Sequence, residues 1–396
     1  MRGIGRALAL VALGLGVWGC PSRGPVEFGA VLPLTGWASD YGQAIRNGIE
    51  LAHEQVQANP EAPRVKLVVI DSQTDPERAA AALERLYGEG ATAVIGGVLS
   101  VEALAMVPVA DEADRVLLSP SATQPQLSGI SSNFFRVCAS DFAEGTVMAR
   151  YAADNLRLRT GLVLAKEETY AKGIQVVFAE EFERKGGRIV ETIEFPANTS
   201  DFEALADRAV TLKPDFVYLA AFAEEVSRLI QDLRQEGFDG LILTTSSIAV
   251  GDAIESTGEA AEGIYFTQTA FDIEGKNVAP NVQAFADAYR AKFGNAPDLY
   301  AAHGYDSYLV LIEAIAQGGD SPLHFWKGMR GIREYPGVTG PLQFDEKGDV
   351  KKFPHVYVVD NGRAVDVEVK RQEAIDKARE EMEKLQEEIR KLREGG

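Results

Sequence analysis

Cysteine and histidine are scarce in this 396-residue chain, and both shortages exclude kinds of site. The two cysteines, Cys20 and Cys138, rule out a disulfide framework, and four scattered histidines without a close pair provide no zinc site. Basic residues are also few, since 40 lysines and arginines stand against 59 aspartates and glutamates, giving a net charge of -19. This acidity argues against nucleic acid as a partner.

The motifs that mark common catalytic sites are missing too. The chain has no G-x-S-x-G elbow, no P-loop, no G-x-G-x-x-G after the first expected strand and no H-E-x-x-H. We therefore expect a protein that is not an enzyme, with no metal site and no cofactor.

The first apolar run is too short to form a stable membrane span. It covers residues 7–17 behind Arg2 and Arg6, below the roughly 18 to 20 residues that a spanning helix needs. Residues 1–19 are therefore predicted to be an export signal, and Gly19-Cys20 resembles the lipobox of bacterial lipoproteins, in which the cysteine is lipidated. We expect a lipid-anchored protein at the periplasmic face or cell surface, with residues 20–25 as a short tether; an ordinary secretory signal with an incidental cysteine is the alternative. Cys138 would then be the only thiol of the mature chain, and we expect it to be a small buried apolar residue.

What the chain does contain, from Val26 onward, is an alternation of β-branched strands and amphipathic helices. The expected strands are 28–32, 66–71, 93–96, 116–119, 160–165, 189–195, 216–221, 242–245, 264–266 and 356–359. The expected helices between and after them are 41–58, 76–88, 101–112, 143–155, 171–185, 202–212, 225–236, 282–293 and 300–317. Strands separated by helices of this length predict βαβ units with parallel sheets, and hence two open α/β lobes.

The C-terminal stretch, residues 370–396, has a different composition. Apolar residues recur there at spacings of 3 and 4 among charged ones, at Ile375, Ala378, Met382, Leu385, Ile389 and Leu392. This stripe spans fewer than three heptads, so a single solvated helix and weak self-association through residues 371–393 both stay open.

Small hydroxyl residues follow two of the expected strands. Open parallel sheets bind ligands beyond the carboxyl ends of their strands, where Ser100, Ser121 and Thr123 lie. Their hydroxyls, with backbone N–H groups at a helix N-terminus, could hold an anion such as a carboxylate. Serine and threonine at these positions are also ordinary helix caps, so the pattern alone does not decide between the two roles.

Aromatic residues occupy the same class of loop. Trp37 and Tyr41 follow the first strand, Tyr170 follows the strand ending near Ala165, and Phe222 follows residue 221. Aromatic walls around a few polar anchors are typical of small-ligand clefts, with core packing as the alternative for Phe222.

In this order, a set of short stretches resembles the branched-chain amino-acid-binding proteins, the type I solute-binding proteins of ABC importers. The resemblance runs from Val26 to about Val367 and rests on residues 32–36, 41–42, 71–76, 94–100, 119–123, 134–136 with Asp141, 170–173, 201–202, 214–218, 305–306 and 340–344.

The resemblance implies a fold of two Rossmann-like lobes joined by a three-crossover hinge, with each lobe discontinuous in sequence. We place the crossovers near Ala139, Thr267 and Gly340. The first lobe would comprise residues 26–139 and 268–339, the second 140–267 and 340–369, followed by the C-terminal helix.

The resemblance also implies roles for individual residues. The ligand carboxylate would lie at Ser100, Ser121 and Thr123, with Ala122 in the same stretch, and Tyr41 would cover the cleft. The ligand amino group would meet Asp141, Tyr170, Phe222 and a second acid at the position of Ser246.

Two of these positions depart from the pattern. Ser246 carries no carboxylate, and Phe222 replaces a hydroxylated aromatic. Because a buried ammonium group needs a charge partner, Asp141 would serve alone or with Glu224 or Glu225, and a ligand without an amino group stays open.

The resemblance implies a receptor that captures a small carboxylate-bearing solute, such as a branched-chain or other amino acid, and delivers it to ABC permease subunits. The alternative is a lipoprotein of the same fold that acts through protein contacts, as a sensor or an activator of cell-wall synthases.

Overall fold

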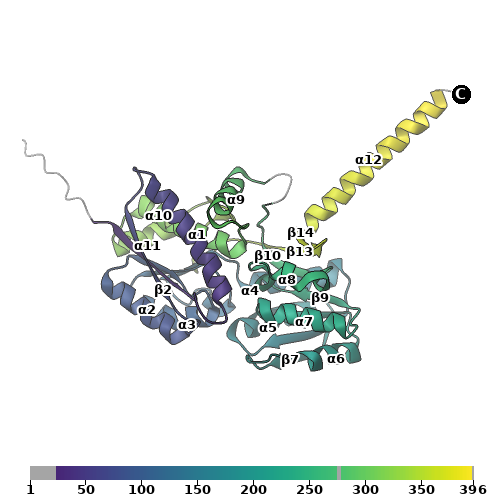
Figure 1. Ribbon diagram of the computed structural model, residues 1–396, viewed down its shortest axis with the longest axis horizontal. Helices are drawn as coiled ribbons and strands as arrows, with labels where there is room; N and C mark the ends of the chain where they lie inside the picture. The colour runs from purple at the N-terminus through teal and green to yellow at the C-terminus, as the bar shows by residue number, and fades with distance from the viewer. Residues whose placement is uncertain (1–23, 274–277, 395–396) are drawn as a thin grey trace, which may run out of the picture.

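The computed structural model describes residues 24–273 and 278–394, so the expected signal and Cys20 lie outside the described residues. The structure has the two-lobed α/β architecture that the sequence predicts, with one sheet in each lobe (Figure 1). Among the described residues, no helix is both long enough and apolar enough to cross a membrane.

The first lobe is built on a parallel sheet with the strand order β2-β1-β3-β4-β5. Its strands are β1 (Val26–Leu32), β2 (Val65–Asp71), β3 (Ala93–Gly96), β4 (Val116–Ser119) and β5 (Phe134–Arg136). Its helices are α1 (Ser39–Ala58), α2 (Pro76–Glu89), α3 (Ser100–Ala113), η1 (Pro125–Leu127), α9 (Pro280–Phe293), α10 (Leu299–Gly318) and α11 (Pro322–Gly331).

Helices cover both faces of this sheet because β1 is apolar on both sides. Phe28 and Ala30 pack in the same core cluster as residues of α1 and α10, whereas Val31 packs with α2 and α3. The α1 and α10 backbones come so close that a Cβ at Gly48 would lie 1.9 Å from a carbonyl oxygen of α10. Asp75 caps α2, as its position before Pro76 suggests, by accepting a hydrogen bond from the Arg78 N–H at 2.9 Å.

The second lobe contains a seven-stranded sheet in the order β14-β13-β10-β9-β8-β6-β7. Its strands are β6 (Thr160–Lys166), β7 (Arg188–Phe195), β8 (Phe216–Ala220), β9 (Leu241–Thr244), β10 (Tyr265–Thr269), β13 (Pro354–Asp360) and β14 (Arg363–Asp366). Its helices are α4 (Asp141–Arg150), which continues as the π-helical turn η2 (Tyr151–Asn155), and α5 (Thr169–Arg184), α6 (Glu203–Leu212), α7 (Ala223–Gln235), η3 (Ser246–Ala249), α8 (Ala253–Thr257) and η4 (Gly258–Ala261). Strands β6 to β10 run parallel, and β13 and β14 add an antiparallel edge.

The division of the chain between the lobes stays a proposal. Strand pairing favours a second and a third crossover that lie later in the sequence than the expected positions near Thr267 and Gly340. Thr267 lies inside β10, so the chain leaves this sheet after Thr269. Gly340 begins β12 (Gly340–Leu342), the second strand of a hairpin with β11 (Tyr335–Gly337), and past this hairpin the chain still packs on the first lobe. Phe344 stacks edge-on against Phe135 with ring centroids 5.3 Å apart, and the chain joins the second sheet only at Pro354.

The C-terminal helix, α12 (Val367–Glu394), extends away from the body (Figure 1). Its first part lies against β13 and β14. Its apolar side chains Ile375, Met382, Leu385, Ile389 and Leu392 are exposed. The helix therefore has an apolar face that no described part of the chain covers.

Candidate functional site

The loop between β1 and α1 places two aromatic residues at the cleft between the lobes. Asp71, at the end of β2, holds this loop by accepting hydrogen bonds from the Leu34 N–H at 2.9 Å and the Thr35 hydroxyl at 2.7 Å. Trp37 stays half exposed, whereas Tyr41, in the first turn of α1, is buried. The carboxylate of Asp71 is therefore occupied by hydrogen bonds from the protein's own loop.

The N-terminus of α3 and the loop after β4 form one polar wall of the cleft. The Ser121 hydroxyl donates to the Val98 carbonyl oxygen at 2.8 Å, and the Ser100 hydroxyl accepts from the Gln124 N–H at 3.3 Å. Because the Ser121 proton is engaged in this way, Ser121 chiefly joins the two loops. Thr123 and the N-terminal turn of α3 remain beside it as donors for an anion.

Tyr41 connects the two lobes. Its hydroxyl donates to the Ser247 carbonyl oxygen at 3.1 Å and accepts from the Ala223 N–H at 2.9 Å. Its ring lies edge-on against Phe222 and Tyr300, with centroids 5.9 and 4.8 Å away. Residues of the first lobe and the second lobe therefore meet directly in this structure.

Seven of the nine residues expected in the ligand site surround one small cavity. Its volume is about 30 Å³, and its walls come from both lobes. The expected residues that line it are Tyr41, Ser100, Ser121, Thr123, Tyr170, Phe222 and Ser246. Val98, Leu99, Ser247 and Tyr300 complete the wall. The topology thus brings together side chains that lie as far apart in the sequence as Tyr41 and Tyr300, which are 259 positions apart.

Ala122 and Asp141 lie behind this wall. The Ala122 N–H donates to the Ser119 hydroxyl at 2.9 Å, and its carbonyl oxygen accepts from Arg136 at 3.2 Å, so Ala122 shapes the loop. The backbone N–H of Asp141 donates to the Thr123 carbonyl oxygen at 2.8 Å. Among the described residues, neither carboxylate oxygen of the fully buried Asp141 has a partner at full hydrogen-bond geometry, and the Thr123 side chain is the weak donor that approaches it.

Glu144 is the acidic residue that the sequence analysis missed. The Ser246 hydroxyl donates to its two carboxylate oxygens at 3.0 and 3.1 Å, across more than a hundred positions of sequence. Glu144 also lines a second cavity of about 20 Å³ that shares Ser246, Thr123 and other walls with the first. The signal that could have found it is the spacing of three residues from Asp141, which places both acids on one face of α4.

Burial determines the protonation of these acids. It raises the pKa of Glu144 to about 7, and it raises the pKa of Asp141 well above its usual value, with the nearby charge of Glu144 adding to the effect. His303, in the wall of the second cavity, is buried, neither of its ring nitrogens has a hydrogen-bond partner in the part of the chain that the structure describes, and burial lowers its pKa well below the usual value. His303 is therefore neutral and supplies no cation to the acids.

Cys138 lies against the same wall as a buried free thiol, as expected. Its Sγ lies 3.4 Å from the Ala122 carbonyl oxygen, and burial raises the pKa of the thiol to about 12. A thiol that stays protonated in this way is a poor nucleophile, so Cys138 acts as a packing residue.

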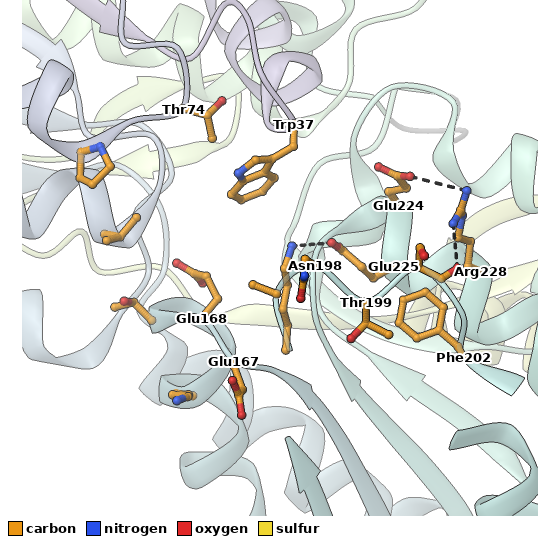
Figure 2. Close-up of a pocket in the computed structure, with 17 residues that line it drawn as sticks. Trp37, Thr74, Glu167, Glu168, Asn198, Thr199, Phe202, Glu224, Glu225 and Arg228 are labelled. Carbon is orange, nitrogen blue, oxygen red and sulfur yellow. Dashed lines mark hydrogen bonds and ion pairs between the residues drawn. The ribbon is translucent and has the colours of Figure 1, made fainter. Parts of the chain in front are cut away.

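A larger compartment of about 630 Å³ lies at the outer rim of the cleft (Figure 2). Trp37 and Thr74 of the first lobe face Glu168, Asn198 and other residues of the second across it. Lys166 forms an ion pair with Glu225, and its Nζ lies 4.5 Å from the centre of the Trp37 ring.

Glu224 and Glu225, the expected substitutes for the missing acid at Ser246, belong to this rim. Glu225 pairs with Lys166, and Glu224 lies 3.9 Å from Arg228 at the protein surface. Neither lines the two inner cavities. Both are therefore engaged outside the enclosed site, which leaves Glu144 as the acid nearest to Ser246.

This arrangement of an enclosed cavity between two α/β lobes agrees with the result of comparison with known families. Residues 25–359 match the family model described as periplasmic binding protein. The chain belongs to the periplasmic binding protein family. The resemblance seen in the sequence is therefore confirmed.

Several relatives of this periplasmic binding protein are named as amino-acid-binding proteins. A leucine-, isoleucine-, valine-, threonine- and alanine-binding protein of Pseudomonas aeruginosa is 26% identical over 343 residues, covering 85% of this chain and 90% of the relative. The solved structure of a leucine-binding protein from Thermotoga maritima is similar with a TM-score of 0.80 and 31% identity, covering 86% of this chain and 97% of the other.

A branched-chain amino acid transporter substrate-binding protein from Streptococcus pneumoniae, solved with isoleucine, is equally similar in fold. Its TM-score is 0.80 and its identity 26%, with 86% of this chain and 98% of the other covered. All three relatives are named as binding proteins, and the one from Streptococcus pneumoniae is named as the substrate-binding protein of a transporter.

Proposed function

We propose that this periplasmic binding protein captures an amino acid in the enclosed cavity between its lobes and delivers it to an ABC importer. The observation that carries the proposal is the cavity itself, which is lined from both lobes by hydroxyl and aromatic side chains and closed by Tyr41. The relatives named as amino-acid-binding proteins support the same ligand class.

The polar wall at α3 would hold the ligand carboxylate. The N-terminal turn of a helix presents unpaired N–H groups and a partial positive charge, both of which favour an anion. Ser100 opens α3 at the cavity, and Thr123 lies beside it. Carboxylate binding here needs no lysine or arginine.

Ligand entry would require the lobes to separate. The two inner cavities, of about 30 and 20 Å³, are far smaller than the several hundred Å³ of a typical ligand pocket. Hinge motion of the three crossovers would break the Tyr41 hydrogen bonds, admit the ligand past Trp37 and close again around it.

The test is a thermal-shift screen of the protein beginning at Pro21, refolded from denaturant to remove any bound ligand. A ligand present at 100 times its Kd stabilises by about 2.7 kcal/mol, which shifts Tm by several degrees. Ser100→Ala and Thr123→Ala should each weaken binding by about tenfold, as expected for a lost hydrogen bond to a charged group. Ser256→Ala, at an exposed position of α8, is the control and should leave binding unchanged. Absence of stabilisation by any amino acid, small carboxylate or amide would refute the proposal.

We further propose that Cys20 carries a lipid anchor that keeps the receptor at the outer side of a membrane. The lipobox pattern supports this. Metabolic labelling with palmitate should mark the wild-type protein and not Cys20→Ser, which should be released into the soluble exported fraction.

A second proposal concerns α12, which would pair with a second copy of this chain as a short parallel coiled coil. The a positions are Ile375, Met382 and Ile389, and the d positions are Ala378, Leu385 and Leu392. Isoleucine at two of the three a positions and leucine at two of the three d positions favour two parallel helices. An antiparallel pair would bring the e positions Arg379 and Arg393 together, which repel.

Sedimentation equilibrium over a wide concentration range tests this pairing. The wild-type protein should show weak dimerisation, and both Leu385→Asp and truncation after residue 369 should abolish it while ligand binding stays unchanged. A monomer at all concentrations would instead favour the sensor or synthase-activator alternative, in which α12 contacts a different protein.

A further inference from the structure

The enclosed site contains two buried acids that are close in sequence and lack a cation. Asp141 and Glu144 lie three residues apart in the first turn of α4, the helix that follows the first crossover between the lobes. Both are essentially inaccessible to solvent. Among the described residues, neither forms an ion pair, because Arg136, the charged neighbour of Asp141, is paired with Asp349 at 2.7 Å.

The carboxylate of Glu144 reaches the place where the sequence pattern predicts an acid and this chain has Ser246. The Ser246 hydroxyl donates to both carboxylate oxygens, which fixes the orientation of the Glu144 side chain toward the cavity wall. The small serine side chain leaves room for this approach. The acid is thus supplied by α4 of the polypeptide rather than by the loop after β9.

The unpartnered polar atoms around the cavities point to a donor of several hydrogen bonds. Within the described part of the chain, both oxygens of Asp141 and the hydroxyl of Tyr170 are buried with no partner at full hydrogen-bond geometry, and only the Thr123 and Thr245 side chains approach them as weak donors. A protonated amino group presents three N–H donors and a positive charge, which satisfies carboxylate and phenol oxygens at once. Leaving such acids buried without a partner is costly.

We propose that Glu144 takes over the charge of the acid missing at Ser246 and, with Asp141, makes this site specific for ligands that carry a protonated amino group beside their carboxylate. The inference rests on the proposed function, because it assumes that the ligand lies in the enclosed cavity. It assigns the ligand class as α-amino acids, and it disfavours aromatic acids, keto acids and amides that lack the ammonium group.

The test is isothermal titration of L-leucine and of 4-methylpentanoate, which is leucine without its amino group. Wild-type protein should bind leucine at least tenfold more tightly than 4-methylpentanoate. Glu144→Gln, which has the same shape, should weaken leucine binding by at least tenfold and leave binding of 4-methylpentanoate unchanged or stronger. Another amino acid and its deaminated analogue replace this pair if the thermal-shift screen identifies a better ligand.

Two further variants separate charge from packing. Glu144→Gln combined with Ser246→Glu moves the carboxylate to the loop after β9 and should restore most of the lost leucine affinity. Ser246→Ala keeps the charge and removes only the orienting hydroxyl, so it should weaken leucine binding by a few fold.

The outcomes distinguish this inference from the proposed function. Equal leucine binding by wild type and Glu144→Gln would overturn the inference and leave the receptor function intact. Tighter binding of 4-methylpentanoate than of leucine by wild type would also overturn it, with a non-amino carboxylate as the ligand. Failure of wild type to bind any member of the panel would instead refute the proposed function.

Discussion

Replacement of Glu144 by glutamine should make the ligand-free protein more stable at alkaline pH, although the variant is expected to bind its ligand less well. In the native state burial raises the pKa of Glu144 to about 7 from the usual value of 4.5. Between these pH values the native carboxyl keeps a proton that the unfolded chain has released. The free energy of unfolding therefore falls as pH rises through this window.

The size of the effect follows from the shift. The pKa of Glu144 is about 2.5 higher in the native state than in the unfolded chain, and a difference of one corresponds to about 1.36 kcal/mol. Burial of this carboxyl therefore lowers the free energy of unfolding by roughly 3 kcal/mol above pH 7 and has no such effect below about pH 4.5. Glutamine cannot ionise, and its amide oxygen can still accept the hydrogen bond from Ser246. The free energy of unfolding of Glu144→Gln should therefore exceed that of wild type by up to about 3 kcal/mol at pH 8, and by little at pH 4.5.

Urea unfolding of ligand-free protein at pH 4.5 and pH 8 measures this difference. Glu181→Gln is a control of opposite sign, because hydrogen bonds from Arg184 lower the pKa of Glu181 to about 2, with Arg150 contributing. That carboxylate stabilises the native state above pH 4.5, so its removal should destabilise the protein at pH 8. A Glu144→Gln variant that loses the same stability at both pH values would refute the reasoning, because the buried charge would then carry no cost.

Three other changes test how the lobes are built and held together. Tyr41→Phe removes the hydroxyl that bonds to two backbone groups of the second lobe, so ligand affinity should fall by about tenfold, as calorimetry would show, with little change in the Tm of the ligand-free protein. Gly48→Ala forces a Cβ against a carbonyl oxygen of α10 and should cost about 1 to 3 kcal/mol in urea unfolding, whereas Gly88→Ala, where a Cβ meets nothing within 4 Å, should be neutral or stabilising. Asp349→Ala leaves the fully buried Arg136 unpaired and should lower the free energy of unfolding by about 3 to 5 kcal/mol; a loss below about 1 kcal/mol would show that solvent replaces the carboxylate.

The regular part of the fold could be predicted because its signals are local. The expected strands at residues 93–96 and 116–119 have the same bounds as β3 and β4, since short β-branched runs buried on both faces are distinctive. The helix at residues 76–88 carries its own N-cap and apolar face, and it ends one residue later than expected.

The short elements escaped prediction because other parts of the chain determine them. The strand β5 has three residues and ends in a buried arginine, Arg136, which no hydrophobic pattern marks as a strand. Its charge is satisfied by Asp349, 213 positions away. The hairpin of β11 and β12, the edge strand β14 and the helix α11 were missed for the same reason, since each is short and depends on packing against distant segments.

The βαβ alternation, the parallel strands of both sheets and the loops that carry the polar and aromatic residues of the cleft can be recognised in the sequence, because they depend on patterns within ten to twenty neighbouring residues. The family can be recognised there as well, because its short motifs follow one another in order along the chain. Long-range packing, by contrast, lets Tyr41 bridge the lobes and puts Asp141 behind the cavity wall. It alone placed Glu144 against Ser246, 102 positions away, because the folding of two lobes onto one hinge sets which carboxylate reaches a buried site.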